Sequence, residues 1–555
     1  MGQTIRRRSW LRYLGLIALV VLFVLDLHST VAHNSTKGYQ LFYKVSEVER
    51  PAPWDRTTVA VVRTNTEGIP NPVDPDRLGF RITTEQIEEM VRLAVEMTGG
   101  MKSVISPDDK LVLIKPNWVT DAPSGSGSIT DNRVVRAVVK LVYEANPDAE
   151  IVVADGSGEW IDPELAAKYS VTRAQIRDGL DTNGYREMVE ELKRDPSLPG
   201  LKVRLDDLNV PLSDTVLAHL PGGGWYQDTY WTHRLVTEAD KIISVPVMKI
   251  HGTRITVSLK NNIGVAPGAR YGWAKNGLDH NPAVMDKTIV DMARVADIDY
   301  VVVDAVTALE RAYTRANGSP LYRNMIVAGR DTVAVDTVCA RLMGFNPDDI
   351  SHVTMAALCG MGINDLERID IVGESLESAG YLFQKNIVHQ TWLGRSKEGQ
   401  SVRFWTVNLA SEPMDPDAVP TPGQGGWSEP LYASDDFIDI SKAFPGQSGR
   451  YYYAFTHFYA PRNQKAELRV GSSTPMRVWI DGELVYDFRG VNRQHVMPND
   501  VIPIDLVEGN HQLLVETRKG TFNLTIAEPV PENIPDPRYP DRYAGTRVHG
   551  LKFFL

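Results

Sequence analysis

VPVMKIHGTRITVSLKNNIGVAPG, residues 245–268, brings together more chemically active side chains than any other stretch of the chain. An apolar strand is predicted from Ile242 to Met248, and it runs directly into Lys249 and His251. A second cation and two amides follow at 260–262. A strand that serves only packing ends in turn residues, whereas ligand-binding groups in α/β sheets gather at the carboxyl ends of strands. This stretch therefore predicts a buried strand that delivers a binding site.

Each of these residues also has an ordinary structural interpretation. Lys249 and Lys260 taken singly are typical of solvated charges, and His251 of a hydrogen-bonded loop histidine. Their occurrence together, with partners from other strand ends, favours the site.

Composition limits the function classes. At 555 residues the chain is expected to form two to four domains, and 43% apolar with 23% charged residues is typical of a folded soluble protein. A net charge of −11 and a pI near 5.6 argue against a nucleic-acid-binding surface. The negative net charge is nevertheless compatible with a local basic pocket for a small anion. The only two cysteines, Cys339 and Cys359, have no CxxC spacing, which excludes an iron–sulfur cluster and a cysteine-based zinc site.

The N-terminus has the layout of an export signal or membrane anchor. Arginines at positions 6–8 and 12 precede an apolar run from Leu14 to Leu25. The run Arg7–Arg12 resembles a twin-arginine export signal, and Thr30-Val31-Ala32 offers small residues for cleavage. We expect export to the periplasm, the cell envelope or the outside. Whether the segment is cleaved or stays in the membrane is open.

From Thr57 the pattern changes to short apolar runs that alternate with amphipathic segments, which predicts an α/β domain with a mainly parallel sheet in Rossmann-like layers. Strands are expected at 58–62, 111–115, 151–154, 300–303 and 369–372, and helices at 84–98, 132–145 and 331–343. Asp336, within the last helix, is interpreted as structural, as a cap or partner in its own helix.

Beyond residue 430 short strands follow one another without any helical period, which predicts an all-β sandwich. Asp481-Gly482 is a strong hairpin signal between two of them. The resulting domain prediction runs as follows: export signal or anchor 1–33, linker 34–56, α/β domain 57–390, linker and first strands 391–444, β-sandwich 445–527, and a proline-rich tail 528–555.

Several polar residues lie at predicted strand ends, which meet at one edge of a parallel sheet. Two kinds of site are open. A divalent metal suits His251, His280, Asp304 and Glu310, because imidazole and carboxylate are its usual ligands. Alternatively, lysines clamp a phosphate or carboxylate while a histidine moves a proton. The candidate catalytic residues are Lys249, His251, Lys260 and His280, and the candidate ligand-binding residues are Lys115, Asn117, Asp155 and Asn261.

Segments from about 57 to 390 resemble the family named domain of unknown function 362. The resemblance rests on KPNW at 115–118, ADGSG at 154–158, the central stretch at 245–264, His280, Asp291, VVVDAVTALE at 301–310 and AGRDTVAVDTVCARLMG at 328–344. It implies an α/β fold and candidate sites but no reaction. Many relatives carry ferredoxin-like cysteine motifs, which this chain lacks, so the resemblance implies no electron-transfer role.

The sandwich resembles the galactose-binding-like jelly-roll modules of secreted glycosidases. The resemblance rests on YYYAFTHFYAP at 451–461, ELRVGSSTPMRVWIDGELVYDFR at 467–489 and IDLVEGNHQLLVET at 504–517. In that scaffold Trp479 is a core position. Arg489, Arg493 and His495 lie in a loop and are better candidates for sugar binding, with solvated loop charges as the alternative interpretation.

Two functions follow from the sequence. The first is an exported or anchored enzyme that binds a divalent metal or small anionic substrate in its α/β domain, with the sandwich as an accessory carbohydrate-binding-like module. The second is a non-catalytic envelope protein that binds glycans or organises structure.

Overall fold

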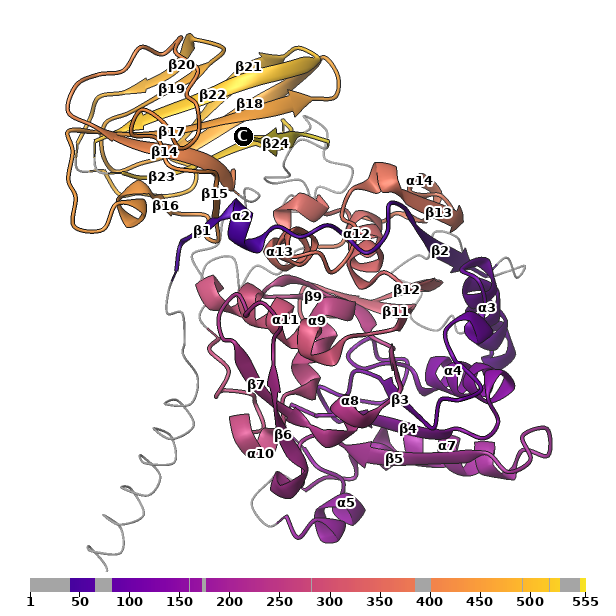
Figure 1. Cartoon of the computed structure of the whole chain (residues 1–555). Coiled ribbons are helices and arrows are strands. Elements are labelled where there is room, and N and C mark those ends of the chain that lie inside the picture. Colours follow the sequence, from indigo (N-terminus) through magenta and orange to yellow (C-terminus); the bar gives the residue numbers. More distant parts are fainter. Residues whose placement is uncertain are drawn as a thin grey trace, which may run out of the picture.

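The computed structural model describes residues 40–64, 82–158, 160–171, 176–280, 282–384, 401–491, 493–518, 520–529 and 550–555. They form a mixed α/β domain and a β-rich C-terminal domain, drawn in orange to yellow (Figure 1). The predicted export segment at 1–33 lies outside the described residues. No helix within these described ranges is both long and apolar enough to span a bilayer.

A ten-stranded sheet forms the centre of the α/β domain. β5, β4, β3, β8 and β11 run parallel, as the sequence predicts, while β12 is antiparallel to both β11 and β2. The strand order is β13 (Ile369–Gly373), β2 (Thr57–Arg63), β12 (Ser319–Gly329), β11 (Tyr300–Glu310), β8 (Lys241–Ser244), β3 (Leu111–Lys115), β4 (Glu150–Asp155) and β5 (Lys202–Asp207), with β9 (Val247–His251) and β10 (Arg254–Thr256) attached beside β11.

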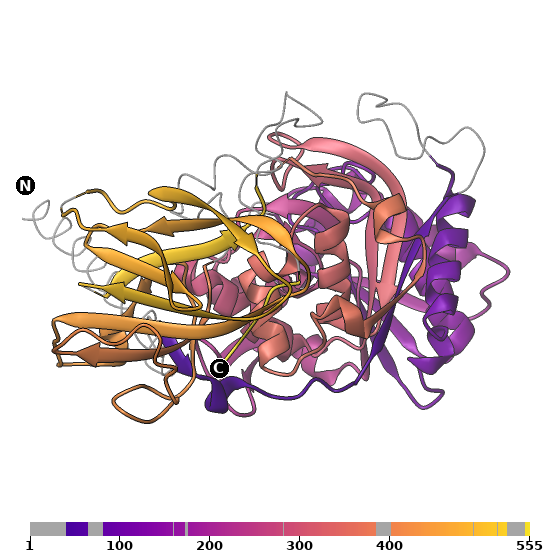
Figure 2. The same ribbon diagram turned by 90° about the horizontal axis from the view of Figure 1, so that it is seen from above.

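Both faces of this sheet are buried, because successive side chains along a strand point to opposite sides. In β2, Val59 and Val61 join one apolar cluster while Ala60 and Val62 join another. Helices cover both faces (Figures 1 and 2). Contributors to one cluster are α3 (Thr84–Met97), α4 (Asn132–Ala145) and α7 (Tyr185–Arg194), and contributors to the other are α11 (Pro282–Ala296), α12 (Thr332–Leu342) and α13 (Ser351–Leu358).

The direction of chain crossing reverses between β3 and β8. These strands are hydrogen-bonded neighbours, with Ile114 opposite Ile243. From β3 the chain passes through α4 to β4 on one side, whereas from β8 it passes through α11 to β11 on the other. Such a reversal opens a crevice at the carboxyl ends of the two strands, where ligands of open α/β folds bind.

The central stretch makes two strands rather than the single strand predicted from Ile242 to Met248. β8 ends at Ser244, and β9 begins at Val247, after Pro246. Proline has no N–H to give to a ladder, so it interrupts the strand. β9 then pairs with β10, with Ile250 opposite Ile255, and this hairpin stands at the crevice.

The C-terminal domain is a sandwich of two antiparallel sheets. Apolar side chains from both sheets fill its core, among them Trp405, Leu468, Val515 and Leu524. One sheet contains β1 (Phe42–Lys44), β15 (Leu431–Ala433), β14 (Phe404–Ala410), β17 (Tyr451–Ala460), β22 (Gly509–Thr517), β19 (Met476–Ile480), β20 (Glu483–Phe488) and β24 (Lys552–Phe554); the other contains β16 (Ile438–Asp439), β23 (Thr521–Ala527), β18 (Gln464–Gly471) and β21 (Asp500–Leu506).

Segments from both ends of the chain complete this sandwich. Phe42–Lys44, within the predicted linker, is β1, and Lys552–Phe554, within the predicted tail, is β24. Such short strands carry no period of their own, so the sequence pattern does not reveal them. Asp481 and Gly482, both with positive φ, form the predicted hairpin between β19 and β20.

Candidate functional site

A small cavity of about 70 Å³ lies at the carboxyl ends of β3 and β4, beside the β9–β10 hairpin. It is large enough for a few waters or one small anion, since about 10–15 Å³ accommodates one water. Its polar lining comes mainly from predicted strand ends and from the helical turn after β10. The polar side chains of the lining are Asn117, Asp155, Lys249, His251, Thr256, Lys260, Asn261, Lys275 and Tyr313.

Lys115 and Asp155 form a buried ion pair at the cavity floor. Lys115 Nζ donates to Asp155 Oδ1 at 2.6 Å, and both side chains are almost fully buried. Asp155 Oδ2 accepts from the backbone N–H of Trp118 at 2.7 Å. Gly264 packs its backbone so closely that a Cβ there would lie 2.1 Å from Asp155 Oδ1. Lys115 is therefore already neutralised by protein.

Lys249 projects from β9 into the cavity wall and is buried. Its Nζ donates to Asn117 Oδ1 at 2.9 Å and to the carbonyl of Ser128. Both partners are neutral, so no carboxylate balances this ammonium directly. Burial, followed by the neighbouring charge of Lys260, holds the pKa of Lys249 well below its usual value.

Two asparagines join the strand ends around the cavity. Asn117 donates to Asn261 Oδ1 at 3.0 Å. Asn261 Nδ2 in turn donates to Ser244 Oγ at 3.1 Å and to the carbonyl of Lys115 at 3.3 Å. This amide chain fixes β3 and β8 to the turn that carries Lys260.

Lys260 lies on the short helix α9 (Ser258–Asn261) and is half-buried. Its ammonium donates no hydrogen bond within the described part of the chain. Burial lowers the pKa of Lys260 to about 8, and Asp286 opposes that effect. Lys260 is the cavity cation with the fewest protein partners.

Asp336 explains the position of α9. Its carboxylate accepts from the backbone N–H groups of Ser258 and Leu259, at 2.8 and 3.1 Å. The prediction that Asp336 is structural agrees with this geometry, but its partner is α9 rather than its own helix α12. A carboxylate at a helix start satisfies N–H groups that have no partner inside the helix.

Lys275 was missed by the sequence analysis. Its buried Nζ donates to Asn209 Oδ1 and, at 2.7 Å, to the carbonyl of Ala266. Burial lowers the pKa of Lys275 to about 8, and Asp207 and Asp155 oppose that effect. Lys275 has a φ of 57° and lies in a loop without any periodic pattern, so the sequence gives no signal for it.

The two predicted site histidines lie in different places. His251 lines the cavity with its ring centroid 4.7 Å from that of Tyr313, a second residue that the sequence did not single out. His280 is exposed, its Nδ1 lies 2.8 Å from the carbonyl oxygen of Leu278, and it is not among the lining residues.

Asp304 and Glu310 also lie apart from the cavity. The strand predicted to end at Asp304 continues to Glu310, so Asp304 is inside β11. Its oxygens accept from the N–H groups of Asp131 and Val306, at 2.7 and 3.0 Å. Glu310 accepts from the N–H of Gln384 at 2.6 Å. The four predicted metal ligands therefore do not converge, and among the described residues no three His, Cys, Asp or Glu side chains form a metal-binding group.

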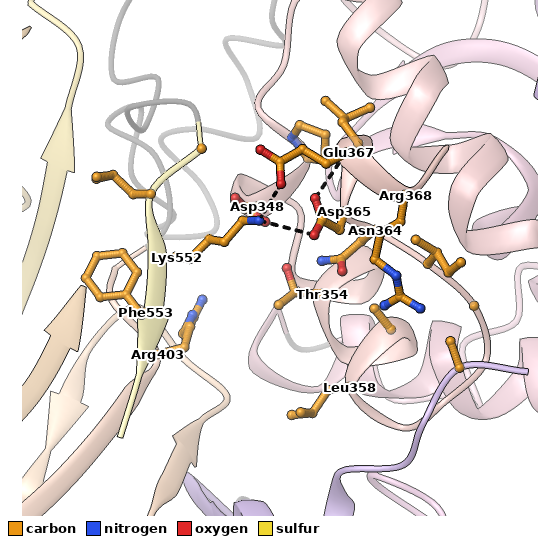
Figure 3. Close-up of a pocket in the computed structure, with 18 of the residues that line it drawn as sticks. Asp348, Thr354, Leu358, Asn364, Asp365, Glu367, Arg368, Arg403, Lys552 and Phe553 are labelled. Carbon is orange, nitrogen blue, oxygen red and sulfur yellow. Dashed lines mark hydrogen bonds and ion pairs between the residues drawn. The ribbon is translucent and has the colours of Figure 1, made fainter. Parts of the chain in front are cut away.

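A larger cavity, of about 560 Å³, lies between the two domains (Figure 3). Lys552 of the sandwich reaches Glu367 at 2.9 Å and Asp365 at 3.3 Å (Figure 3). Its lining mixes acids and bases that neutralise one another at exposed positions. Because exposed ion pairs are common in structural contacts, this cavity is the weaker candidate despite its size.

The loop residues considered for sugar binding are engaged within the sandwich. Arg493 donates to Asp500 at 2.6 Å and to the hydroxyl of Tyr486, and Arg489 pairs with Asp487. His495 packs edge-on against Phe437, with ring centroids 4.9 Å apart. Trp479 is buried, as its core position predicts.

Comparisons with solved structures show distant likenesses. The apoprotein of lactate racemase from Thermoanaerobacterium thermosaccharolyticum matches at 13% identity and a TM-score of 0.25, covering 44% of this chain and 56% of that one. An anti-sigma factor domain-containing protein matches at 12% identity and a TM-score of 0.17, and the match covers 23% of this chain and 43% of that one. This chain thus spans about half the length of these structures, and such TM-scores support no inference.

Among curated proteins, a thylakoid-associated protein of Synechocystis sp. is 26% identical over 282 residues, which cover 49% of this chain and 74% of the relative. The galactose-binding-like resemblance of the sandwich stays a prediction. The cavity of about 70 Å³ is called the lysine cavity, after Lys249, Lys260 and Lys275 in its lining. Residues 112–341, which contain every residue lining the lysine cavity, match the family described as "Domain of unknown function (DUF362)".

Proposed function

We propose that this protein binds a small anion of carboxylate or phosphate type in the lysine cavity, and that the α/β domain is an enzyme for which this anion is part of the substrate. One observation carries the proposal. Three lysines line the cavity and Lys115 pairs with the lining residue Asp155; among the described residues, only Lys115 of these four has a carboxylate within hydrogen-bonding distance. Buried charge is costly unless it is paired, so a bound anion would balance the remaining ammonium groups.

The donors around the cavity suit an anion better than a metal. Lys249, Lys260 and Lys275 present positive charge, whereas Asp155 is already paired with Lys115. Groups with strongly shifted pKa values that gather in a cleft at a strand-order reversal are typical of active sites. His251 and Tyr313 add groups able to transfer a proton.

Titration calorimetry with inorganic phosphate, acetate and pyruvate tests the proposal. We expect saturable binding of at least one of them to the parent protein. Lys260→Met should weaken that binding at least about tenfold, which corresponds to about 1.4 kcal/mol, a typical value for one charged hydrogen bond. Lys102→Met, at an exposed lysine outside the cavity, is the matched control and should bind like the parent. Equal binding by Lys260→Met and the parent would contradict the proposal.

We also propose that the segment from Leu14 to Leu25 directs the protein to or across a membrane. Its arginine-led apolar pattern supports this, and the curated relative is named as thylakoid-associated. Fractionation of cells that express the full chain or a chain lacking residues 1–33 is the test. Equal amounts of both in the cytosolic fraction would refute it.

A further inference from the structure

Lys115 and the three lysines that line the cavity differ in how their amines are held. Lys115 Nζ donates to Asp155 and to the carbonyl of Pro116, and Lys249 Nζ to Asn117 and the carbonyl of Ser128. Lys275 Nζ is likewise held by Asn209 and the carbonyl of Ala266. Each of these three amines is committed to two acceptors. Lys260 lines the same cavity and, within the described ranges, donates to none.

An amine without acceptors has its lone pair and its hydrogens available to a ligand. Lys249 lies close enough to Lys260 for the charge of Lys260 to lower the pKa of Lys249. A lysine that is desolvated in a pocket becomes a nucleophile near neutral pH. The lowered pKa of Lys260 agrees with this, since roughly a tenth of its amine is neutral at pH 7.

The groups that face Lys260 come from several elements. Asp286 of α11 favours the protonation of Lys260, against the effect of burial. The charge of Lys260 in turn lowers the pKa of Lys249 of β9. Asp286 also bonds the buried His352 of α13, Oδ1 to Nδ1 at 2.9 Å, so its carboxylate is held in place. His251 and Tyr313 form the adjacent wall.

We propose that Lys260 forms an imine with a small anionic carbonyl compound, of the 2-oxo acid type, whose carboxylate is bound by the neighbouring ammonium and amide groups. This rests on the anion site proposed above and names its ligand class. The neutral Nζ attacks the carbonyl carbon, and the carbon–oxygen double bond opens to a carbinolamine. The two amine hydrogens then leave with the oxygen as water, and a carbon–nitrogen double bond remains. No oxidant or reductant is required.

Size and charge favour this ligand class. A cavity of about 70 Å³ admits only a molecule of a few heavy atoms, such as glyoxylate or pyruvate. The Asn117 amide uses one of its two hydrogens on Asn261, and the Lys249 ammonium uses two of its three, so each has one hydrogen left for the carboxylate of the ligand. His251 and Tyr313 are placed to exchange protons with the carbinolamine oxygen as it leaves.

Trapping with a hydride donor tests the proposal. The full chain is incubated with glyoxylate or pyruvate and sodium cyanoborohydride, which adds hydride to the imine carbon, and the modified lysine is located by peptide mass spectrometry. We expect one dominant adduct at Lys260, formed faster as the pH rises through about 8. Excess phosphate should slow it by competing for the same cavity.

The variant Lys260→Arg distinguishes imine formation at Lys260 from anion binding in the cavity. It keeps the positive charge, so anion binding by calorimetry should persist while the adduct disappears. An adduct at Lys249, or one spread over exposed lysines such as Lys102, would overturn the imine proposal. Saturable anion binding without any adduct at Lys260 would overturn it too while leaving the anion site intact, and absence of both would overturn the two together.

Discussion

The carboxylate of Asp336 accepts a 2.8 Å hydrogen bond from the backbone N–H of Ser258, and thereby fixes the start of the turn that carries Lys260 and Asn261. This bond joins α12, on one face of the sheet, to the cavity edge. The placement of Lys260 therefore depends on a residue that never contacts the cavity.

Asp336→Ala should lower the free energy of unfolding by about 1–3 kcal/mol, because two buried N–H groups lose their acceptor. It should also weaken anion binding, since Lys260 is no longer positioned. Urea unfolding and calorimetry measure the two effects. The control is Thr83→Ala, which removes the capping box of α3 and should cost about 1 kcal/mol without any loss of binding. Unchanged binding in Asp336→Ala would show that α9 holds its place without this contact.

Replacing Asp155 alone should lower the free energy of unfolding far more than replacing Asp155 and Lys115 together. Asp155→Ala leaves the ammonium of Lys115 buried without its counter-ion, which costs about 3–5 kcal/mol. The double variant Asp155→Leu, Lys115→Met should recover most of that loss in denaturant unfolding. Additive losses in the double variant would argue against a coupled pair.

Gly264 should tolerate no side chain. The Cβ of Gly264→Ala would meet Asp155 Oδ1 at 2.1 Å and Lys115 Nζ at 2.8 Å, so we expect a loss of at least about 1–3 kcal/mol and of anion binding. Gly200→Ala serves as control: its Cβ meets nothing within 4 Å, so it should bind normally, although the φ of +79° at this position costs some stability. Parent-like binding by Gly264→Ala would place the ligand elsewhere.

The lowered pKa of Lys260 predicts that the free energy of unfolding changes with pH in the alkaline range. Its pKa is about 8 in the folded protein and about 10.4 when unfolded, so the unfolded chain binds more protons between these values. The contribution of Lys260 to the free energy of unfolding should therefore rise as the pH increases from about 8 to about 10.4. Affinity for phosphate should fall over the same rise, because the ammonium is lost. Comparison of urea unfolding for the parent and Lys260→Met at pH 7 and pH 10 isolates the effect, and identical pH slopes would contradict it.

The sequence predicted the strand ends better than the complete cavity. Lys115 and Asp155 follow short apolar runs, and the period of those runs places both at one sheet edge, where the structure brings them together with Lys249 and Asn261. Lys275 lies on a loop whose course depends on contacts with Asn209, distant in sequence, so no local pattern shows it.

The predicted metal ligands failed to converge for a physical reason. Asp304 resembled a strand end, because β11 was expected to stop after Val303. Its pairing with β12 extends the ladder through Glu310, and both carboxylates accept backbone N–H groups away from the cavity. Hairpin pairing between distant residues overrode the local signal.

The most direct test of the anion site is a crystal structure of the protein grown with selenate, a tetrahedral anion with an anomalous signal. We predict a selenium peak inside the cavity, with an oxygen in hydrogen-bonding distance of Lys260 Nζ and near Lys249. A cavity that contains only water, with selenate bound elsewhere on the surface, would contradict the account.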